Sequence, residues 1–394
     1  MTTIISFYKC LDVMGGAERL LIEEHRGFKR MGFHSKVVTC HLSQRIGCIA
    51  AFAEDEIEIL SPGPFPLVAL RLARALQRHP RAVVLCASGH IDVYLACLIT
   101  GHRYFLHAHH PASMTVNIAE TFSRLTRRHF HLLAASNFGG TRLIEQDARI
   151  GVIKRCLLDM KCVLSFLAMK NARGVFVLSE FAQREKQLLY GINATVARGA
   201  IHGPRQRQEC EAASRLRAGK RMVLSISRLY RDKRVDVVIA GFAAAFRDEP
   251  DVVLVIGGTG EELERLRGLA ASLGIADRVM FAGFIPDDQL YGFYGAADLF
   301  VVIDWADFVI TAFEALSVGT PTLVSSEGDY DQALSDSGYL HSSDPTPEAV
   351  GLAMRTALHA PPRSVAALSS ALEACTWSNL CLQVTGRMMA ADGA

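Results

Sequence analysis

Two basic residues stand in the segment that follows an apolar run near the middle of the chain. Arg228 and Lys233 come after the expected strand 222–226 and before an expected amphipathic helix. An arginine and a lysine placed together can neutralise the negative charge that develops on a diphosphate leaving group, without a metal ion. A basic surface loop has the same composition, so the pattern alone leaves both interpretations open.

A carboxylate that could bind a nucleotide lies further along, in the segment 307–321. A turn there leads into an expected helix 311–318, with Glu314 about one helical turn inside it. Amides at a helix N-terminus bind phosphate groups, and a nearby carboxylate can accept hydrogen bonds from ribose hydroxyls. Taken alone, a glutamate on a helix is more often a solvated side chain. The assignment of Glu314 therefore depends on other segments.

Apolar runs alternate with helical patterns along the chain, which is typical of doubly wound parallel sheets. The expected strands of the first half are 3–8, 36–39, 82–86, 103–106 and 174–178, and those of the second half are 222–226, 252–256, 279–282, 299–303 and 322–325. The strands 174–178 and 322–325 are expected to be the last of their sheets. We predict an α/β protein with Rossmann-like domains at 1–203 and 220–375, a linker at 204–219, and a final helix at 376–394. Ligands of such sheets bind at the carboxyl ends of the strands, so a cleft between the domains is the expected site.

The composition narrows the classes of function. A chain of 394 residues exceeds the usual size of one domain. The 42 basic and 40 acidic residues nearly balance, which argues against nucleic acid as a partner. The ten cysteines show no zinc-ligand spacing and no Asp-x-Asp metal motif is evident, so neither a metal site nor disulfides are expected. No signal peptide or transmembrane segment is predicted, which favours a cytoplasmic protein.

Five segments of the second half occur in an order that resembles the donor domain of the family-4 retaining glycosyltransferases (glycosyl transferases group 1). They are the pair Arg228 and Lys233 and the ranges 255–261, 281–286, 297–299 and 308–321. The first half is similar to the family more weakly, at 15–19, 106–111 and 175–179. Trp377 opens a last helix that resembles the family's crossover back to the first domain. The resemblance implies the GT-B fold, in which two Rossmann-like domains face a cleft.

The same resemblance implies a role for each matched residue. Arg228 and Lys233 would hold the diphosphate, and Glu314 would bind the ribose. The other donor-binding positions would act through the backbone: Phe284 and Ile285 at the base, Ile310 and Thr311 at the phosphates or sugar, and Gly15 and Gly16 in close approach to the donor phosphates.

A histidine after a strand of the first half would line the reacting centre, again by resemblance. His109 fits best because the family has His-x-Pro at this place. His107 and His110 remain alternatives, and a purely structural role is open for each of them.

The sequence departs from the family at positions that would contact the transferred sugar. The family has paired glutamates eight positions apart, and the first of them is replaced by Ala306. Its loss removes a polar anchor worth on the order of 1–3 kcal/mol. Asp304 and Asp307 flank the gap, and either could substitute from a shifted loop. Val309 also replaces a usual glycine, which would crowd the sugar pocket or alter its backbone.

The segment 113–173 matches the family poorly and is rich in basic residues. It has ten Lys and Arg against four acids, interleaved with Leu, Ile and Phe. Basic amphipathic helices of this kind can lie on anionic lipid, with about 1 kcal/mol for each base near the surface. A solvated helical face is the alternative interpretation.

These observations lead to one main hypothesis and two alternatives. The chain is expected to transfer a hexosyl unit, with retention and without a metal or other cofactor, from a UDP- or GDP-sugar to a glycan, lipid-linked or small-molecule acceptor. Polysaccharide or lipopolysaccharide biosynthesis at the inner face of the cytoplasmic membrane would be its setting. A catalytically weakened protein that binds nucleotide or glycan is the alternative that Ala306 and Val309 suggest. A nucleotide-sugar epimerase is a third option, and a kinase is disfavoured because no phosphate loop ends in Gly-Lys-Ser/Thr.

Overall fold

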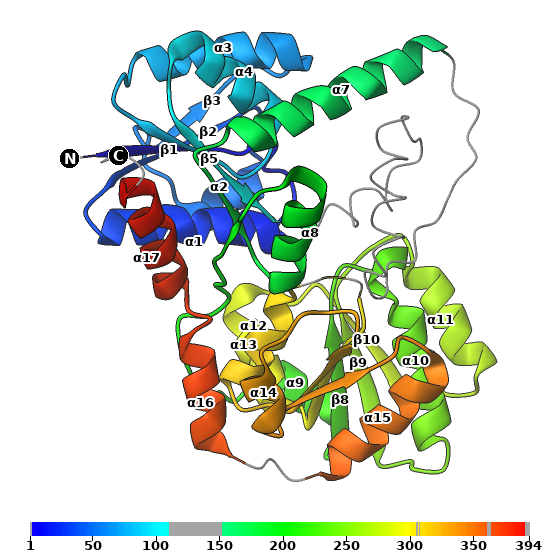
Figure 1. The fold of residues 1–394 in the computed structure, drawn as a ribbon. Helices are drawn as coiled ribbons and strands as arrows, with labels where there is room; N and C mark the ends of the chain where they lie inside the picture. Colours follow the sequence, from blue (N-terminus) through cyan, green and yellow to red (C-terminus); the bar gives the residue numbers. More distant parts are fainter. Residues whose placement is uncertain (1, 110–151, 305, 307, 361–363, 391–394) are drawn as a thin grey trace. The chain divides into compact units, whose positions relative to one another are not determined.

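The computed structural model describes residues 2–109, 152–304, 306, 308–360 and 364–390. The chain forms two compact units, drawn in Figure 1. Unit 1 contains residues 1–199 together with 377–394, and unit 2 contains residues 200–376. Unit 1 therefore consists of two pieces of sequence, whereas unit 2 is continuous.

Unit 1 is built on a parallel sheet of seven strands in the order β3-β2-β1-β4-β5-β6-β7. The strands are β1 (Thr3–Phe7), β2 (His34–Thr39), β3 (Ile57–Ile59), β4 (Val83–Cys86), β5 (Tyr104–Ala108), β6 (Gly174–Val177) and β7 (Thr195–Val196). The expectation that 174–178 is the last strand was wrong, because β7 pairs with β6 beyond it. Both β7 and β3 are too short to give an alternating or apolar run that a sequence pattern could reveal.

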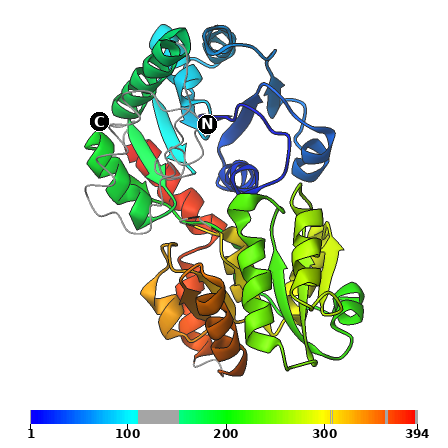
Figure 2. The same cartoon turned by 90° about the vertical axis from the view of Figure 1, so that its right-hand side faces the viewer.

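The helices of unit 1 cover both faces of its sheet, as Figures 1 and 2 show from two sides. One face carries α3 (Phe65–Gln77), α4 (His90–Thr100) and α7 (Val152–Asn171), with α4 packed against both of the others. The other face carries α1 (Gly16–Arg30) and α17 (Trp377–Ala390). Two further helices complete the unit: α2 (Gln44–Ala50) and α8 (Glu180–Tyr190).

The last helix packs closely on α1. Trp377, Leu380 and Val384 lie on one side of α17 at helical spacing, and all three are buried. A Cβ atom on Gly27 of α1 would collide with the sulfur of Cys381, and one on Gly199 would lie 2.8 Å from Leu380. Because glycine has no side chain, these two positions allow α17 to approach the rest of unit 1 closely.

Unit 2 has a second parallel sheet, of six strands in the order β10-β9-β8-β11-β12-β13. They are β8 (Arg221–Ile226), β9 (Val252–Gly257), β10 (Val279–Gly283), β11 (Leu299–Val302), β12 (Thr322–Ser325) and β13 (Leu340–Ser343). The expectation that 322–325 completes this sheet was wrong, because β13 pairs with β12. β13 has the sequence Leu-His-Ser-Ser and gives no apolar signal.

The helices of unit 2 are α9 (Glu211–Arg217), the short 3-10 turn η1 (Arg231–Lys233), α10 (Val235–Phe246), α11 (Leu263–Ser272), α12 (Asp287–Ala296), α13 (Ile310–Ser317), α14 (Gln332–Asp336), α15 (Pro347–His359) and α16 (Val365–Glu373). α10 packs against α15 over a core that includes Phe242 and Val350. α9 lies within the expected linker 204–219 and contacts α12. A Cβ on Gly292 of α12 would collide with Cys210, which is buried just before α9.

Candidate functional site

The sheet of unit 2 reverses its direction of winding between β8 and β11. β8 pairs with β9 on one side and with β11 on the other. The loops that leave two such neighbouring strands diverge, and open α/β sheets bind ligands in the space that this divergence creates. The loop after β8 carries Arg228 and Lys233, and the segment after β11 carries Asp304. These three ionisable side chains thus follow the two strands of the switch point.

Lys233 and Asp304 form an ion pair there. The Lys233 ammonium lies 2.8 Å from Asp304 Oδ2 and 3.7 Å from Asp232 Oδ2. Burial lowers the pKa of Lys233, but the charge and hydrogen bond of Asp304 more than offset burial and leave the pKa above its ordinary value. Lys233 is therefore a fixed positive charge at neutral pH.

Arg228 differs from its basic neighbours in its partners. Its guanidinium lies over the ring of Tyr230, 5.6 Å from the centroid, and the side chain is exposed. Within the described part of the chain it forms no ion pair, whereas Arg234 is paired with the buried carboxylate of Glu327. Arg228 is consequently a cation of this loop that an incoming anion can reach without displacing a carboxylate.

A glycine-rich turn after β9 packs against the loop that carries Arg228. The Leu229 amide donates to the Thr259 carbonyl at 2.9 Å. Gly258 has φ of +122°, and a Cβ there or on Gly260 would collide with the backbone carbonyls of Ser227 and Leu229. The glycines are required because two backbones meet at this place, and they fix the path of the basic loop.

Phe284 and Ile285 follow β10 at the same edge of the sheet. Phe284 is 52% exposed, whereas Ile285 is buried. A Cβ on Gly257, at the end of β9, would lie 2.5 Å from Ile285 Cδ1. Ile285 thus anchors the segment after β10 to β9, and this anchoring leaves the neighbouring Phe284 side chain at the surface.

Glu314 is buried in the second turn of α13, with only 1% of its surface exposed. The interpretation of Glu314 as a solvated helix position was therefore wrong. Its carboxylate accepts a hydrogen bond from the Tyr294 hydroxyl of α12 at 3.1 Å. α13 begins at Ile310, and Ile310 and Thr311 are both half-buried. No side chain caps its N-terminus, where Val309 is the capping residue.

Asp304 is the one candidate among the described residues that could replace the missing first glutamate. Ala306 is half-buried, and Asp307 lies outside the described residues. Asp304 is 5% exposed and contacts Lys233. The pairing of Asp304 with Lys233 was not foreseen from the sequence. The only available signal was an acidic residue directly after an apolar strand, where parallel sheets place functional side chains.

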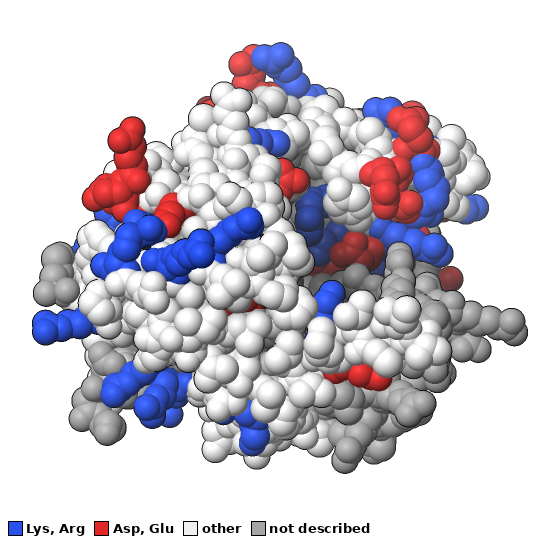
Figure 3. All heavy atoms as spheres, turned by 90° about the horizontal axis from the view of Figure 1, so that it is seen from above, with Lys and Arg blue, Asp and Glu red and all other residues white. Residues whose placement is uncertain are grey.

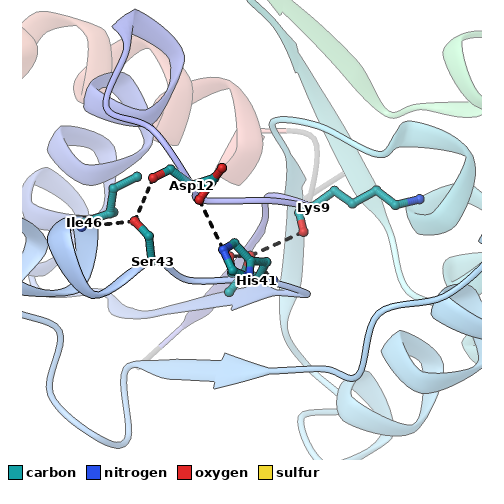
Figure 4. A network of polar contacts seen from close by, with 6 residues as sticks. Lys9, Asp12, His41, Ser43 and Ile46 are labelled. Carbon is teal, nitrogen blue, oxygen red and sulfur yellow. Dashed lines mark hydrogen bonds and ion pairs between the residues drawn. The ribbon is translucent and has the colours of Figure 1, made fainter.

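In unit 1, Gly15 and Gly16 lie where the loop after β1 enters α1. Gly15 is the N-terminal cap of α1, and the loop before it is held by a polar network, shown in Figure 4. Asp12 accepts a hydrogen bond at its main-chain carbonyl from the hydroxyl of Ser43 at 2.7 Å, and its carboxylate lies 3.3 Å from the ring of His41. This network ties the glycine turn to the segment that follows β2.

The histidines at the end of β5 occupy different surroundings. His107 is buried, with its Nδ1 atom 2.7 Å from a carboxylate oxygen of Glu24 on α1. The His109 ring lies at 5.1 Å from the His107 ring and stacks with Tyr8 at 6.4 Å between centroids. His110 lies outside the described residues. The buried pair gives His107 a structural partner, and Glu24 is a residue that the sequence reasoning missed.

The structure thus gathers the expected residues in two separate places. Arg228 and Lys233 follow β8, Phe284 follows β10 and the start of α13 follows β11, all at the carboxyl edge of the sheet of unit 2. Gly15, Gly16 and His109 follow strands β1 and β5 at the carboxyl edge of the sheet of unit 1. Among the described residues no cluster of three or more His, Cys, Asp or Glu side chains is arranged to hold a metal ion. Within the same residues no helix is both long and apolar enough to cross a membrane.

A family model supplies the identity of the second unit. The model of the glycosyl transferases group 1 matches residues 206–371, which include the whole switch-point arrangement of unit 2. Residues 206–371 form a glycosyl transferases group 1 domain. The group 1 domain begins at the segment that carries α9 and ends within α16.

A curated relative is similar over about a third of the chain. Mannosylfructose-phosphate synthase of Agrobacterium fabrum is 34% identical over 134 residues, which are 32% of this chain and 30% of that protein. The chain thus matches less than a third of the length of this relative.

Solved structures are similar over the whole chain, although their sequences are distant. Sucrose-phosphate synthase of Thermosynechococcus elongatus has a TM-score of 0.75 at 17% identity, with all of both chains covered. HepE of Anabaena, solved in complex with UDP, has a TM-score of 0.71 at 17% identity, with 99% of this chain and all of that chain covered. The fold is therefore that of the GT-B class, with two Rossmann-like units, as expected from the sequence.

Proposed function

We propose that this chain is a glycosyltransferase that moves a hexosyl unit from a UDP- or GDP-sugar to a glycan, lipid-linked or small-molecule acceptor. The observation that carries the proposal is the arrangement of Arg228 and Lys233 at the switch point of a group 1 domain. Diphosphate is the ligand chemistry that suits it, because two adjacent cations, one fixed and one exposed, meet the doubled charge of a diphosphate. The complex of the structurally similar HepE with UDP supports the same ligand class.

Each residue of the proposed donor site has a distinct task. Lys233 and Arg228 would stabilise the diphosphate as it leaves, since charge develops there in the transition state. Glu314 would accept hydrogen bonds from the ribose, while amides at Ile310 and Thr311 meet the phosphates or sugar. Backbone near Phe284 and Ile285 would bind the base, and Gly15 and Gly16 would let the backbone approach the donor phosphates.

The proposed reaction proceeds with retention and needs neither a metal ion nor another cofactor. The acceptor hydroxyl attacks the sugar from the face that the diphosphate leaves, and its proton passes to a leaving phosphate oxygen. His109 would line the reacting centre. Its ring is held between His107 and Tyr8, so its orientation is set by unit 1 before any ligand arrives.

A binding protein without turnover is the second candidate, and Ala306 with Val309 favours it. Val309 is buried at the start of α13, where the family has a glycine, and Ala306 offers no polar group to a sugar. A protein that binds the nucleotide but has lost its hold on the transferred sugar would show this combination.

A donor screen separates these two candidates. Purified protein is incubated with a panel of UDP- and GDP-sugars, with and without acceptors, and released nucleotide is measured. We expect release from at least one donor, increased by an acceptor. Binding of UDP or GDP without any release, together with a gain of activity in Ala306→Glu, would instead establish the weakened protein. Interconversion of the donor sugar without an acceptor would identify an epimerase.

We also propose that unit 1 binds an anionic membrane surface, at the inner face of the cytoplasmic membrane. Of the basic segment 113–173, residues 152–173 are described, and 152–171 form α7. Its apolar residues at positions 153, 160, 163 and 167 follow helical spacing and are 36–80% exposed. Lys161 and Lys170 lie on the same helix and are also exposed. An exposed apolar stripe with neighbouring lysines is the pattern of a helix that lies in a lipid headgroup region.

A further inference from the structure

The carboxylate of Asp304 lies just beyond the carboxyl end of β11 in unit 2. It follows β11 by two residues, and Ile303 between them is completely buried. Its oxygen Oδ2 accepts a hydrogen bond from the Lys233 ammonium at 2.8 Å. Its other oxygen, Oδ1, is buried and finds no hydrogen-bond partner among the described residues. A buried carboxylate with one unpaired oxygen lowers the stability of the fold unless a nearby cation compensates its charge.

Lys233 depends on this carboxylate more than on its other neighbours. The charged groups that act on Lys233 are Asp304 from the segment after β11, Asp232 beside it in η1, and Arg228 from the same loop. Asp232 lies farther away, at 3.7 Å, and its side chain is 49% exposed, against 6% for Asp304. Arg228 repels the ammonium. Asp304 is therefore the group that fixes both the place and the charge of Lys233.

We propose that Asp304 is the positioning residue of the donor site and holds Lys233 in the conformation that binds the diphosphate. This inference rests on the proposed function, in which Lys233 binds the diphosphate. A lysine side chain has four rotatable bonds, and holding it in one conformation before the ligand arrives reduces the entropy lost on binding. An ammonium group has three N–H donors, and the bond to Asp304 leaves two for phosphate oxygens.

The contrary possibility is that Asp304 competes with the diphosphate for Lys233. In that case removal of the carboxylate would free the ammonium and strengthen binding of an anion. The two roles predict changes of opposite sign. A single substitution that keeps the shape of the side chain, Asp304→Asn, therefore decides between them.

The test measures binding of UDP and GDP by titration calorimetry, with uridine and guanosine as ligands that lack the diphosphate. We expect Asp304→Asn to weaken binding of the nucleoside diphosphate about tenfold and to leave nucleoside binding unchanged. Asp232→Asn is the matched control, because it removes the exposed carboxylate from the same lysine and should change the affinity less than about twofold. Asp304→Glu, which keeps the charge, should recover most of the lost affinity.

Diphosphate affinity is also measured at a series of pH values. A purely structural role of Asp304 would not change the pH dependence of this affinity. Without Asp304, burial and Arg228 both favour the neutral form of Lys233, so its pKa should fall. As the pH rises, diphosphate affinity of Asp304→Asn should then decline earlier than the affinity of the wild type. The control variant should follow the wild type.

Three results would overturn parts of this account, and they can be told apart. Unchanged or tighter diphosphate binding by folded Asp304→Asn, with a pH profile like that of the wild type, would reject the positioning role alone. If Asp304→Asn fails to fold, Asp304→Glu is compared with Lys233→Ala instead. An equally low diphosphate affinity of these two variants would reject the positioning role. A wild-type protein that binds neither UDP nor GDP would reject the proposed donor site itself.

Discussion

Individual ionisable residues in both units are half-buried or buried next to a partner of opposite charge. Lys233 with Asp304 belongs to the candidate site, whereas Glu56 belongs to the scaffold of unit 1 and is 13% exposed. Glu56 contacts Lys29, accepts from the Ala53 amide at 3.1 Å, and lies 3.3 Å from the His25 ring. Burial raises the pKa of Glu56, but these hydrogen bonds outweigh burial and lower the pKa to about 2.

Glu56→Gln should lower the free energy of unfolding by about 1 kcal/mol at neutral pH. The folded-state pKa of Glu56 lies below its ordinary value of 4.5, so the charged form is favoured in the native protein. Its contribution is therefore complete above about pH 4.5 and is lost as the pH falls towards 2. Urea unfolding of both proteins at a series of pH values measures the difference.

The matched control for this prediction is Glu211→Gln. Glu211 pairs with Arg215 on the surface of α9 and is 82% exposed, so its removal should have almost no effect. A difference between wild type and Glu56→Gln that stays constant down to about pH 3 would contradict the assigned pKa.

At the scale of elements, apolar or β-branched runs predicted most strands, whereas the very short β3 and β7 and the polar β13 were not predicted. β8 and β9 have central, almost wholly apolar sequences, whereas β3 and β7 have three and two residues. Such short strands form because a neighbouring strand supplies hydrogen-bond partners, which is information from the tertiary structure. α7 illustrates a further case, because its sequence left open whether the helix lies on lipid or has a solvated face, and its exposed apolar residues do not decide between them.

Charged substitutions on α7 should weaken binding to anionic vesicles. Met160 and Val163 are 41% and 45% exposed, so Met160→Asp with Val163→Asp should leave the fold intact. The pair places two carboxylates in the proposed lipid contact, and we expect at least a tenfold loss of partition into vesicles of phosphatidylcholine with phosphatidylglycerol, measured by sedimentation.

Figure 3 views the molecule from the side of α3 and α4, and shows broad areas without charged groups beside several groups of Lys and Arg.

The control variant Leu352→Asp changes a 71% exposed apolar residue of α15 in unit 2 and should bind vesicles as the wild type does. Equal binding by all three proteins, or equal binding to neutral vesicles, would contradict a membrane surface at α7.

At the scale of the whole molecule, the sequence predicted the two Rossmann-like units because each repeats the same alternation of strand and helix. Arg228, Lys233 and Glu314 could be proposed as site residues because their motifs are local in sequence. The Lys233–Asp304 bond could not, since it joins residues 71 positions apart and depends on which strands are neighbours in the sheet. The Glu24–His107 pair spans 83 positions and was missed for the same reason.

Leu380→Ala tests the membership of α17 in unit 1. Leu380 is completely buried, and its truncation should cost about 2–5 kcal/mol of stability. Hydrogen exchange measured by mass spectrometry should show faster exchange in α1, on which α17 packs, and unchanged exchange in α15 of unit 2. Leu382→Ala is the control, because this residue of the same helix is 56% exposed. Equal acceleration in α1 and α15 would contradict the division into units.

The distribution of unit 1 over both ends of the described chain has a consequence for biosynthesis. Domains commonly fold as they emerge during synthesis, with the N-terminal one first. Here the residues 1–199 leave the ribosome long before α17 is translated, and until then the α1 surface that α17 covers stays open to water. Unit 2 is complete once residue 376 has emerged. The later-synthesised unit is therefore the first that can reach its native state, and the final step of folding belongs to the unit that was synthesised first.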